Sequence, residues 1–115
     1  MMRTNFSMEY QNITMVKGDT VSFNVEVFDN DGNPITVDSA DMVCKKRVLG
    51  DDVTFHKSLG DGITQSQGIM TVRVAPGDTR DAEAGLYFYD FQIGVGDDIF
   101  TLLNGVLTIE QDVTV

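Results

Sequence analysis

Residues 83–93 read Glu83-Ala84-Gly85-Leu86-Tyr87-Phe88-Tyr89-Asp90-Phe91-Gln92-Ile93, and this stretch holds four of the chain's aromatic residues beside a glycine. Successive side chains of a β-strand point to opposite faces. One face therefore carries Tyr87, Tyr89, Phe91 and Ile93, and the other carries Leu86, Phe88, Asp90 and Gln92. We expect the first set to lie in a hydrophobic core, where each large side chain stabilises the fold by a few kcal/mol.

The same stretch has the spacing of a structural motif, the tyrosine corner of immunoglobulin-type sandwiches. In those domains a tyrosine near the start of strand F hydrogen-bonds to upstream backbone, two residues before a disulfide cysteine. Tyr87 has this position, Gly85 precedes it, and Tyr89 stands where the cysteine would be. We interpret Gly85, Tyr87 and Tyr89 as fold-determining. A carbohydrate-stacking platform is the less favoured reading, because such platforms need exposed rings.

Period-two alternation recurs along most of the chain, and helical periodicity is sustained nowhere. Strands are indicated at about 19–28, 40–48, 53–57, 68–74, 86–95 and 99–109, with turns such as Asp29-Asn30-Asp31-Gly32-Asn33-Pro34 between them. The sequence predicts an all-β, immunoglobulin-like antiparallel β-sandwich of about seven strands, with an N-terminal arm at 1–11 and the domain at 12–115.

One short helical turn is predicted near residues 77–84, after Pro76 ends a strand. Asp78 or Thr79 is the expected cap, and Gly85 is expected to end the turn.

Two groups of residues are candidates for an interface. Phe88 points outward among polar neighbours, so it is either covered by a loop or available to a partner, and Phe100 is the second outward aromatic. The cluster Lys45-Lys46-Arg47 reads first as a charged edge strand that resists aggregation. A patch for an acidic partner surface is the alternative reading of this cluster.

The composition bounds the function. The chain has 18 acidic and 8 basic residues, a formal net charge of -10, which disfavours binding to nucleic acid or anionic membranes. No apolar run has the length of a secretory signal or a membrane span, so synthesis in the cytoplasm is expected. A lone cysteine, Cys44, and a lone histidine, His56, give no disulfide, no zinc site and no named catalytic constellation. We therefore predict no enzyme and no cofactor.

Calcium binding on the loops is the sharper alternative reading of the acidity. The segment at 29–33 lacks the EF-hand spacing, because glycine is fourth instead of sixth. Carboxylates from different loops remain candidates for a hard cation, namely Asp51, Asp52, Asp61, Asp97 and Asp98.

Several segments together resemble the small immunoglobulin-like domain of tailed-phage structural proteins, in particular the N-terminal domain of phage baseplate upper proteins. They are Lys17-Gly18-Asp19, Asp31-Gly32-Asn33-Pro34-Ile35, Pro76-Gly77-Asp78-Thr79, Gly85 to Asp90, and Asp112-Val113-Thr114. The resemblance spans about residues 12–115 and implies a virion component of a bacteriophage or prophage, in the tail or baseplate.

On this resemblance the expected partners are other virion proteins, and a homo-oligomer is a further possibility. A carbohydrate- or calcium-binding module is the alternative function. The step from a β-sandwich to a phage particle is an analogy between families, because a fold alone does not specify a function.

Overall fold

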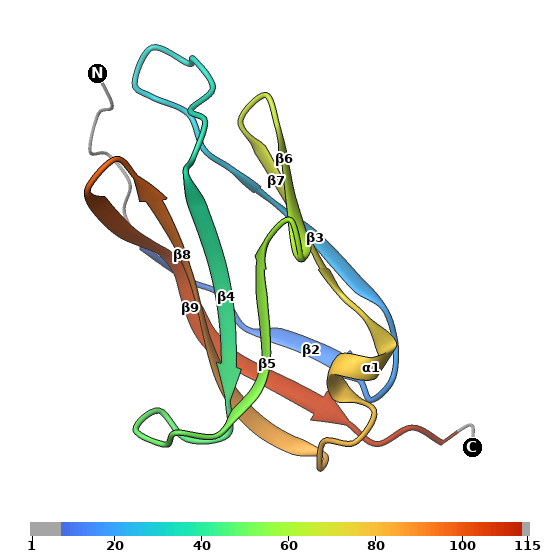
Figure 1. Ribbon diagram of the computed structural model, residues 1–115. Coiled ribbons are helices and arrows are strands. Elements are labelled where there is room, and N and C mark those ends of the chain that lie inside the picture. Colours follow the sequence, from blue (N-terminus) through green and yellow to red (C-terminus); the bar gives the residue numbers. More distant parts are fainter. Residues whose placement is uncertain (1–7, 114–115) are drawn as a thin grey trace.

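The computed structural model describes residues 8–113 and contains, within them, nine β-strands and one short helix (Figure 1). In chain order the elements are β1 (Glu9–Tyr10), β2 (Ile13–Val16), β3 (Val21–Glu26), β4 (Ser39–Lys45), β5 (Val53–Leu59), β6 (Gly62–Ser66), β7 (Ile69–Val74), α1 (Pro76–Thr79), β8 (Gly85–Val95) and β9 (Asp98–Glu110).

The strands form two layers. One layer, the back sheet, has the order β3-β7-β6, and the other, the front sheet, has the order β9-β8-β4-β5, all paired antiparallel. If β3 to β9 are lettered B, C, C′, D, E, F and G, these are the B-E-D and G-F-C-C′ sheets of an immunoglobulin domain. The chain is therefore an all-β, immunoglobulin-like sandwich, as the sequence predicts.

Three pairings differ from a purely antiparallel sandwich. β1 and β2 both lie parallel to β9 at the outer edge of the front sheet. A parallel contact of two residue pairs, Ser58 with Gly62 and Leu59 with Ile63, links β5 to β6 and so connects the two sheets. The structure has nine strands where the sequence predicted about seven, because a strand as short as β1 has too few residues to show alternation.

The core lies between the two sheets and is built from alternate residues of each strand. The large side chains Phe91, Met42, Ile63 and Met70 are almost completely buried. Tyr87, Tyr89 and Ile93 are also buried, at 4% exposure or less, so the inward face predicted for residues 83–93 is confirmed. Cys44 lies in the same core, and burial raises the pKa of its thiol to about 12.

The helix lies earlier in the chain than the sequence predicted. α1 begins at Pro76, with Ala75 as the N-cap, and the carboxylate of Asp78 accepts a hydrogen bond from the Ala75 N–H at 2.7 Å. Proline suits the first helical position because its ring presets φ and the missing N–H has no helical partner there. The prediction of a cap at Asp78 or Thr79 and an end at Gly85 was wrong, since Gly85 begins β8.

An ion pair holds α1 against the front sheet. Lys57 Nζ of β5 lies 2.6 Å from Asp78 Oδ2, and the two side chains are only 11% and 18% exposed. Thr79 is fully buried, and its hydroxyl accepts a hydrogen bond from the Gly18 N–H at 2.9 Å. The helix therefore fastens the β2–β3 connection and β5 to the same corner of the sandwich.

Among residues 8–113, no helix is long and apolar enough to cross a membrane.

Candidate interaction surfaces

The residues that the sequence marked as fold-determining lie at the start of β8. Gly85 has φ +147°, a backbone conformation that favours glycine. The hydroxyl of Tyr87 donates to the carbonyl of Glu83 at 2.7 Å, which is the hydrogen bond of a tyrosine corner. The hydroxyl of Tyr89 donates to the carbonyl of Gln11, so this side chain holds the β1–β2 junction. Burial, and after it the nearby Tyr10, raises the pKa of Tyr89 to about 12.

Phe88 lies on the outer face of the front sheet and is 40% exposed. It lies opposite Lys45 of β4 and Val106 of β9, so its ring rests between two neighbouring strands. A shallow hollow of about 330 Å³ opens beside it, with Tyr10, Val43 and Val48 among its walls. We call these four apolar residues, Tyr10, Val43, Val48 and Phe88, the Phe88 surface.

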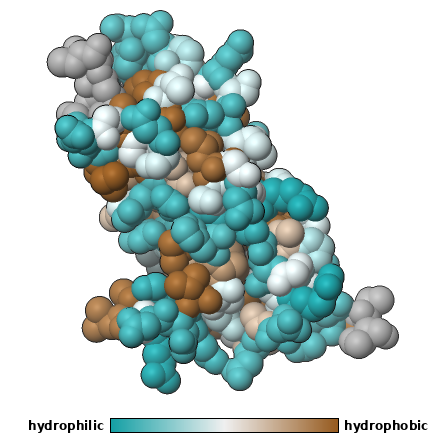
Figure 2. All heavy atoms as spheres, in the orientation of Figure 1, coloured by the Kyte–Doolittle hydropathy of each residue, from teal (hydrophilic) through white to brown (hydrophobic). Residues whose placement is uncertain are grey.

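Two further residues of the Phe88 surface are more exposed than Phe88 itself. Tyr10 is 66% exposed and Val48 is 63% exposed. On the face seen in Figure 2, apolar side chains form small groups separated by hydrophilic ones. A cluster of large exposed apolar side chains is typical of a surface that contacts another protein.

The basic cluster does not form an edge strand. β4 lies between β5 and β8, Lys45 is its last residue, and Lys46 and Arg47 follow in the turn. The reading as a charged edge was wrong because strand position depends on pairing partners, which the local sequence does not encode. Lys46 Nζ lies 2.6 Å from Glu83 Oε2. This hydrogen-bonded pair raises the pKa of Lys46 and lowers that of Glu83.

Phe100 does not belong to the Phe88 surface. It pairs with Ile93 across the β8–β9 hairpin, and because Ile93 points inward, Phe100 points inward too. Its side chain is partly buried and packs against the core. The sequence placed Phe100 outside because an irregularity after Phe91 shifts the β8–β9 register.

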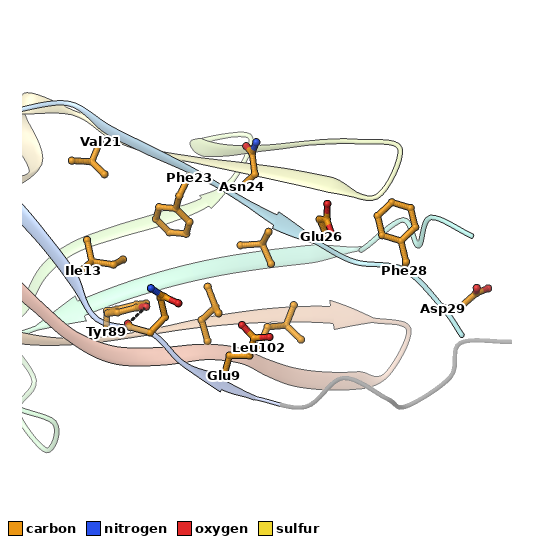
Figure 3. Close-up of a pocket in the computed structure, with 13 residues that line it drawn as sticks. Glu9, Ile13, Val21, Phe23, Asn24, Glu26, Phe28, Asp29, Tyr89 and Leu102 are labelled. Carbon is orange, nitrogen blue, oxygen red and sulfur yellow. Dashed lines mark hydrogen bonds between the residues drawn. The ribbon is translucent and has the colours of Figure 1, made fainter. Parts of the chain in front are cut away.

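A groove of about 780 Å³ opens between β3 of the back sheet and the β1–β2 strands with β9 of the front sheet. Figure 3 shows Ile13, Val21, Phe23, Tyr89 and Leu102 around this space, with the Tyr89 hydrogen bond at its base. Within the described part of the chain, its lining includes the acidic residues Glu9, Glu26 and Asp29 and no lysine or arginine. We call this site the β3 groove.

The sequence pattern does not predict the β3 groove. Alternation over residues 21–27 identified which side chains face inward, but a groove forms only because β1 and β2 pair with β9 instead of β3. No residue pattern in the chain signals that choice of partner.

The predicted loop at 29–34 is a tight turn. The carboxylate of Asp29 accepts hydrogen bonds from the N–H groups of Asn33 and Asp31, both at 2.9 Å, and Gly32 has φ +82°. The Asn33 N–H, with that of Asp31, lowers the pKa of Asp29. Its oxygens are engaged within the turn, which is the role that the sequence favoured over a calcium loop.

The loop carboxylates proposed as cation ligands are not gathered. Between residues 8 and 113, no three acidic, histidine or cysteine side chains lie close enough together to hold a metal ion. Asp51 and Asp52 precede β5, Asp61 precedes β6, and Asp97 and Asp98 lie at the β8–β9 turn. His56 instead contacts Asp41, with Nε2 2.8 Å from the carboxylate.

One polar pair on the front sheet is imperfectly satisfied. Asp90 lies directly opposite Asn104, whose Oδ1 is buried and has no hydrogen-bond partner in the described part of the chain. Burial raises the pKa of Asp90, and the nearby Lys45 opposes this shift only in part. Both residues border the hollow beside Phe88.

The fold and these surfaces define an immunoglobulin-like sandwich with two open faces, the Phe88 surface and the β3 groove. No protein-family model matches this chain, and no curated protein does. Among solved structures, the chain is similar to the crystal structure of the N-terminal Ig1-2 module of the Drosophila receptor protein tyrosine phosphatase DLAR, with 20% sequence identity and a TM-score of 0.46.

That match covers 90% of this chain and 47% of the other, so the chain spans about half the length of the module. The likeness is too weak to support any argument about function. The immunoglobulin-like assignment rests on the strand order and the tyrosine corner.

Proposed function

We propose that this chain is a non-enzymatic structural and interaction component of a bacteriophage or prophage particle, in the tail or baseplate, and that it acts through protein–protein contacts. The link to a particle is supported by the sequence resemblance across residues 12–115. Its partners on this proposal are other virion proteins.

The observation that carries the contact role is the Phe88 surface. Phe88, Tyr10 and Val48 are large apolar side chains that are at least 40% exposed and border one hollow. Aromatic residues are enriched in the energetically important centre of protein interfaces. The basic and acidic pair Lys46–Glu83 is exposed, so it suits the rim of such an interface better than its centre.

The membership of a particle is tested by composition. Particles from the bacterium that encodes the chain are induced, purified on a density gradient and analysed by quantitative mass spectrometry. We expect peptides of this chain in a fixed ratio to the other particle proteins. Detection of the chain in the cell lysate but not in the particle fraction would overturn the proposal.

The role of the Phe88 surface is tested with a matched pair of substitutions. Phe88→Ser removes an exposed ring from that surface, whereas Ile99→Ser removes a 64% exposed side chain from the β8–β9 hairpin. We expect Phe88→Ser to reduce incorporation into particles at least tenfold, with Ile99→Ser close to the parent chain. Equal incorporation of both variants would exclude the Phe88 surface as the contact.

A further inference from the structure

β3 is a strand with a partner on one side only. It ends the strand order and pairs with β7, and among residues 8–113 nothing pairs with its other edge. In an immunoglobulin sandwich this sheet has a strand A beside B. Here β1 and β2, which precede β3 in the chain, both pair with β9. The position of strand A next to β3 is therefore open along the described chain.

The hydrogen-bonding groups of this edge can be assigned. The N–H of Val27 donates to the carbonyl of Gly68, next to β7. Backbone groups of successive residues in a strand point to opposite edges, so those of Ser22, Asn24 and Glu26 point to the open edge. An added strand would meet a ready row of donors and acceptors there.

The β3 groove lies along this edge and exposes core residues to it. Val21 and Phe23 point inward yet are only partly buried, and Ile13 and Leu103 across the groove are in the same state. β3 has six residues, a length of about 20 Å. A strand of six or seven residues would cover these side chains with its own alternate apolar residues.

The charge of the groove restricts its occupant. Glu9, Glu26 and Asp29 line it, and among residues 8–113 no lysine or arginine does. A second copy of this chain carries the same net charge of -10, so two copies repel each other. An extended segment with basic residues at its ends would instead be attracted.

We infer that the β3 groove accepts a β-strand from a different protein, an extended segment with apolar residues at alternate positions and lysine or arginine at its ends. The strand adds to the back sheet beside β3, with main-chain hydrogen bonds for affinity and the groove for selectivity. That the donor is a neighbouring virion protein rests on the proposed function, but the chemistry of the groove does not.

The test uses the full chain and a panel of synthetic seven-residue peptides. Each peptide has Val, Ile, Leu or Phe at three alternate positions and Thr between them, with Lys at both ends, as in KVTVTVK. A matched set has Glu at both ends. Binding is measured by fluorescence anisotropy, and the site by amide NMR shifts of the isotope-labelled chain.

We expect at least one Lys-ended peptide to bind saturably, with its Glu-ended counterpart at least tenfold weaker. The largest amide shifts should fall on Ser22, Asn24 and Glu26. Three results would each overturn the inference: no binding by any peptide, equal binding of both charge sets, or shifts centred on Phe88.

Two substitutions localise the binding. Asn24→Pro removes an N–H from the open edge while leaving the N–H groups that face β7, and it should weaken the Lys-ended peptide about tenfold. Glu26→Lys leaves Glu9 and Asp29 in the groove, so it should narrow the difference in affinity between the Lys-ended and Glu-ended peptides. Asp51→Lys, the same charge change at an exposed residue outside the groove, should have no effect.

Thermal unfolding verifies that each variant is folded, and Glu26→Lys carries the test if Asn24→Pro is not. Light scattering tests the alternative occupant, because a stable dimer that Asn24→Pro dissociates would replace the donor strand by a second copy. Peptide binding by a chain absent from particles would preserve the groove and remove the proposed function. Presence of the chain in particles together with no peptide binding would preserve the proposed function and overturn the inference about the β3 groove.

Discussion

The hydroxyl of Tyr87 reaches back four residues and donates a hydrogen bond to the main-chain carbonyl of Glu83 at 2.7 Å. This bond fixes the chain at its entry into β8, which pairs on both sides in the front sheet. Because the ring is buried, its position is set by packing as well as by the bond.

Tyr87→Phe removes this hydrogen bond and keeps the ring. We expect the free energy of unfolding to fall by about 1 kcal/mol, the usual net value of one such bond. Urea unfolding measures the change. Tyr10→Phe, at a ring that is 66% exposed, serves as the control and should leave stability unaltered. A loss of the same size in both variants would contradict a special role for the corner.

Gly105→Ala tests the attachment of β1 and β2 to β9. A Cβ at Gly105 would collide with the carbonyl oxygen of Gln11, the acceptor of the Tyr89 hydroxyl. We expect destabilisation of about 1 to 3 kcal/mol, as for other overpacked sites. Gly77→Ala, where nothing lies within 4 Å of the new Cβ, should be neutral or slightly stabilising. Equal unfolding midpoints for Gly105→Ala and Gly77→Ala would show that β1 and β2 can shift to accommodate the new Cβ without loss of stability.

Lys57 and Asp78 are expected to be strongly coupled because both are largely buried. Removing one partner leaves the other charge unpaired, so Asp78→Ala should cost about 3 kcal/mol. A double-mutant cycle with Lys57→Met should give a coupling energy of about 1 to 3 kcal/mol. The pair Lys46–Glu83 has the same 2.6 Å separation but is exposed, and its cycle should give a much smaller coupling. A larger value for the exposed pair would refute this account.

Asp90→Asn should stabilise the fold at neutral pH. The raised pKa of Asp90 means that the folded state binds the proton of this carboxyl more tightly than the unfolded state does. The carboxyl therefore lowers the free energy of unfolding as pH rises above about 4. An asparagine has no such penalty, and its amide can donate to the unpartnered Asn104 Oδ1.

The benefit should depend on pH. Unfolding at pH 7 and pH 3 should show a larger benefit of Asp90→Asn at pH 7, because at pH 3 the protonated carboxyl of Asp90 is also neutral and can itself donate to Asn104 Oδ1. Asp97→Asn in the exposed hairpin turn is the control and should change little. A variant less stable than the parent at pH 7 would show that the Lys45 contact outweighs burial.

The fold was predictable because its determinants are local. Alternation fixes which side chains of residues 83–93 face the core, and the spacing from Glu83 to Tyr87 marks the corner. Turn chemistry also works locally, as at Asp29, whose carboxylate bonds within its own loop.

The candidate surfaces were less predictable because they depend on pairing between distant segments. Phe88 could be placed outside from its own strand, whereas Phe100 could not, since the shift after Phe91 moves the β8–β9 register. The basic cluster reads as an edge strand from its local sequence, because the neighbours of β4 are distant segments of the chain. The β3 groove was invisible for the same reason.

The parallel pairing of β2 with β9 also constrains how the protein forms during synthesis. The Val106 N–H donates a hydrogen bond to Asn12 Oδ1, 94 residues earlier in the sequence, so β2 leaves the ribosome well before the strand with which it pairs. Contacts of such sequence separation slow folding. Until β9 emerges, the nascent chain holds β1 and β2 without their partner, and a chaperone that shields extended apolar segments would act in that interval.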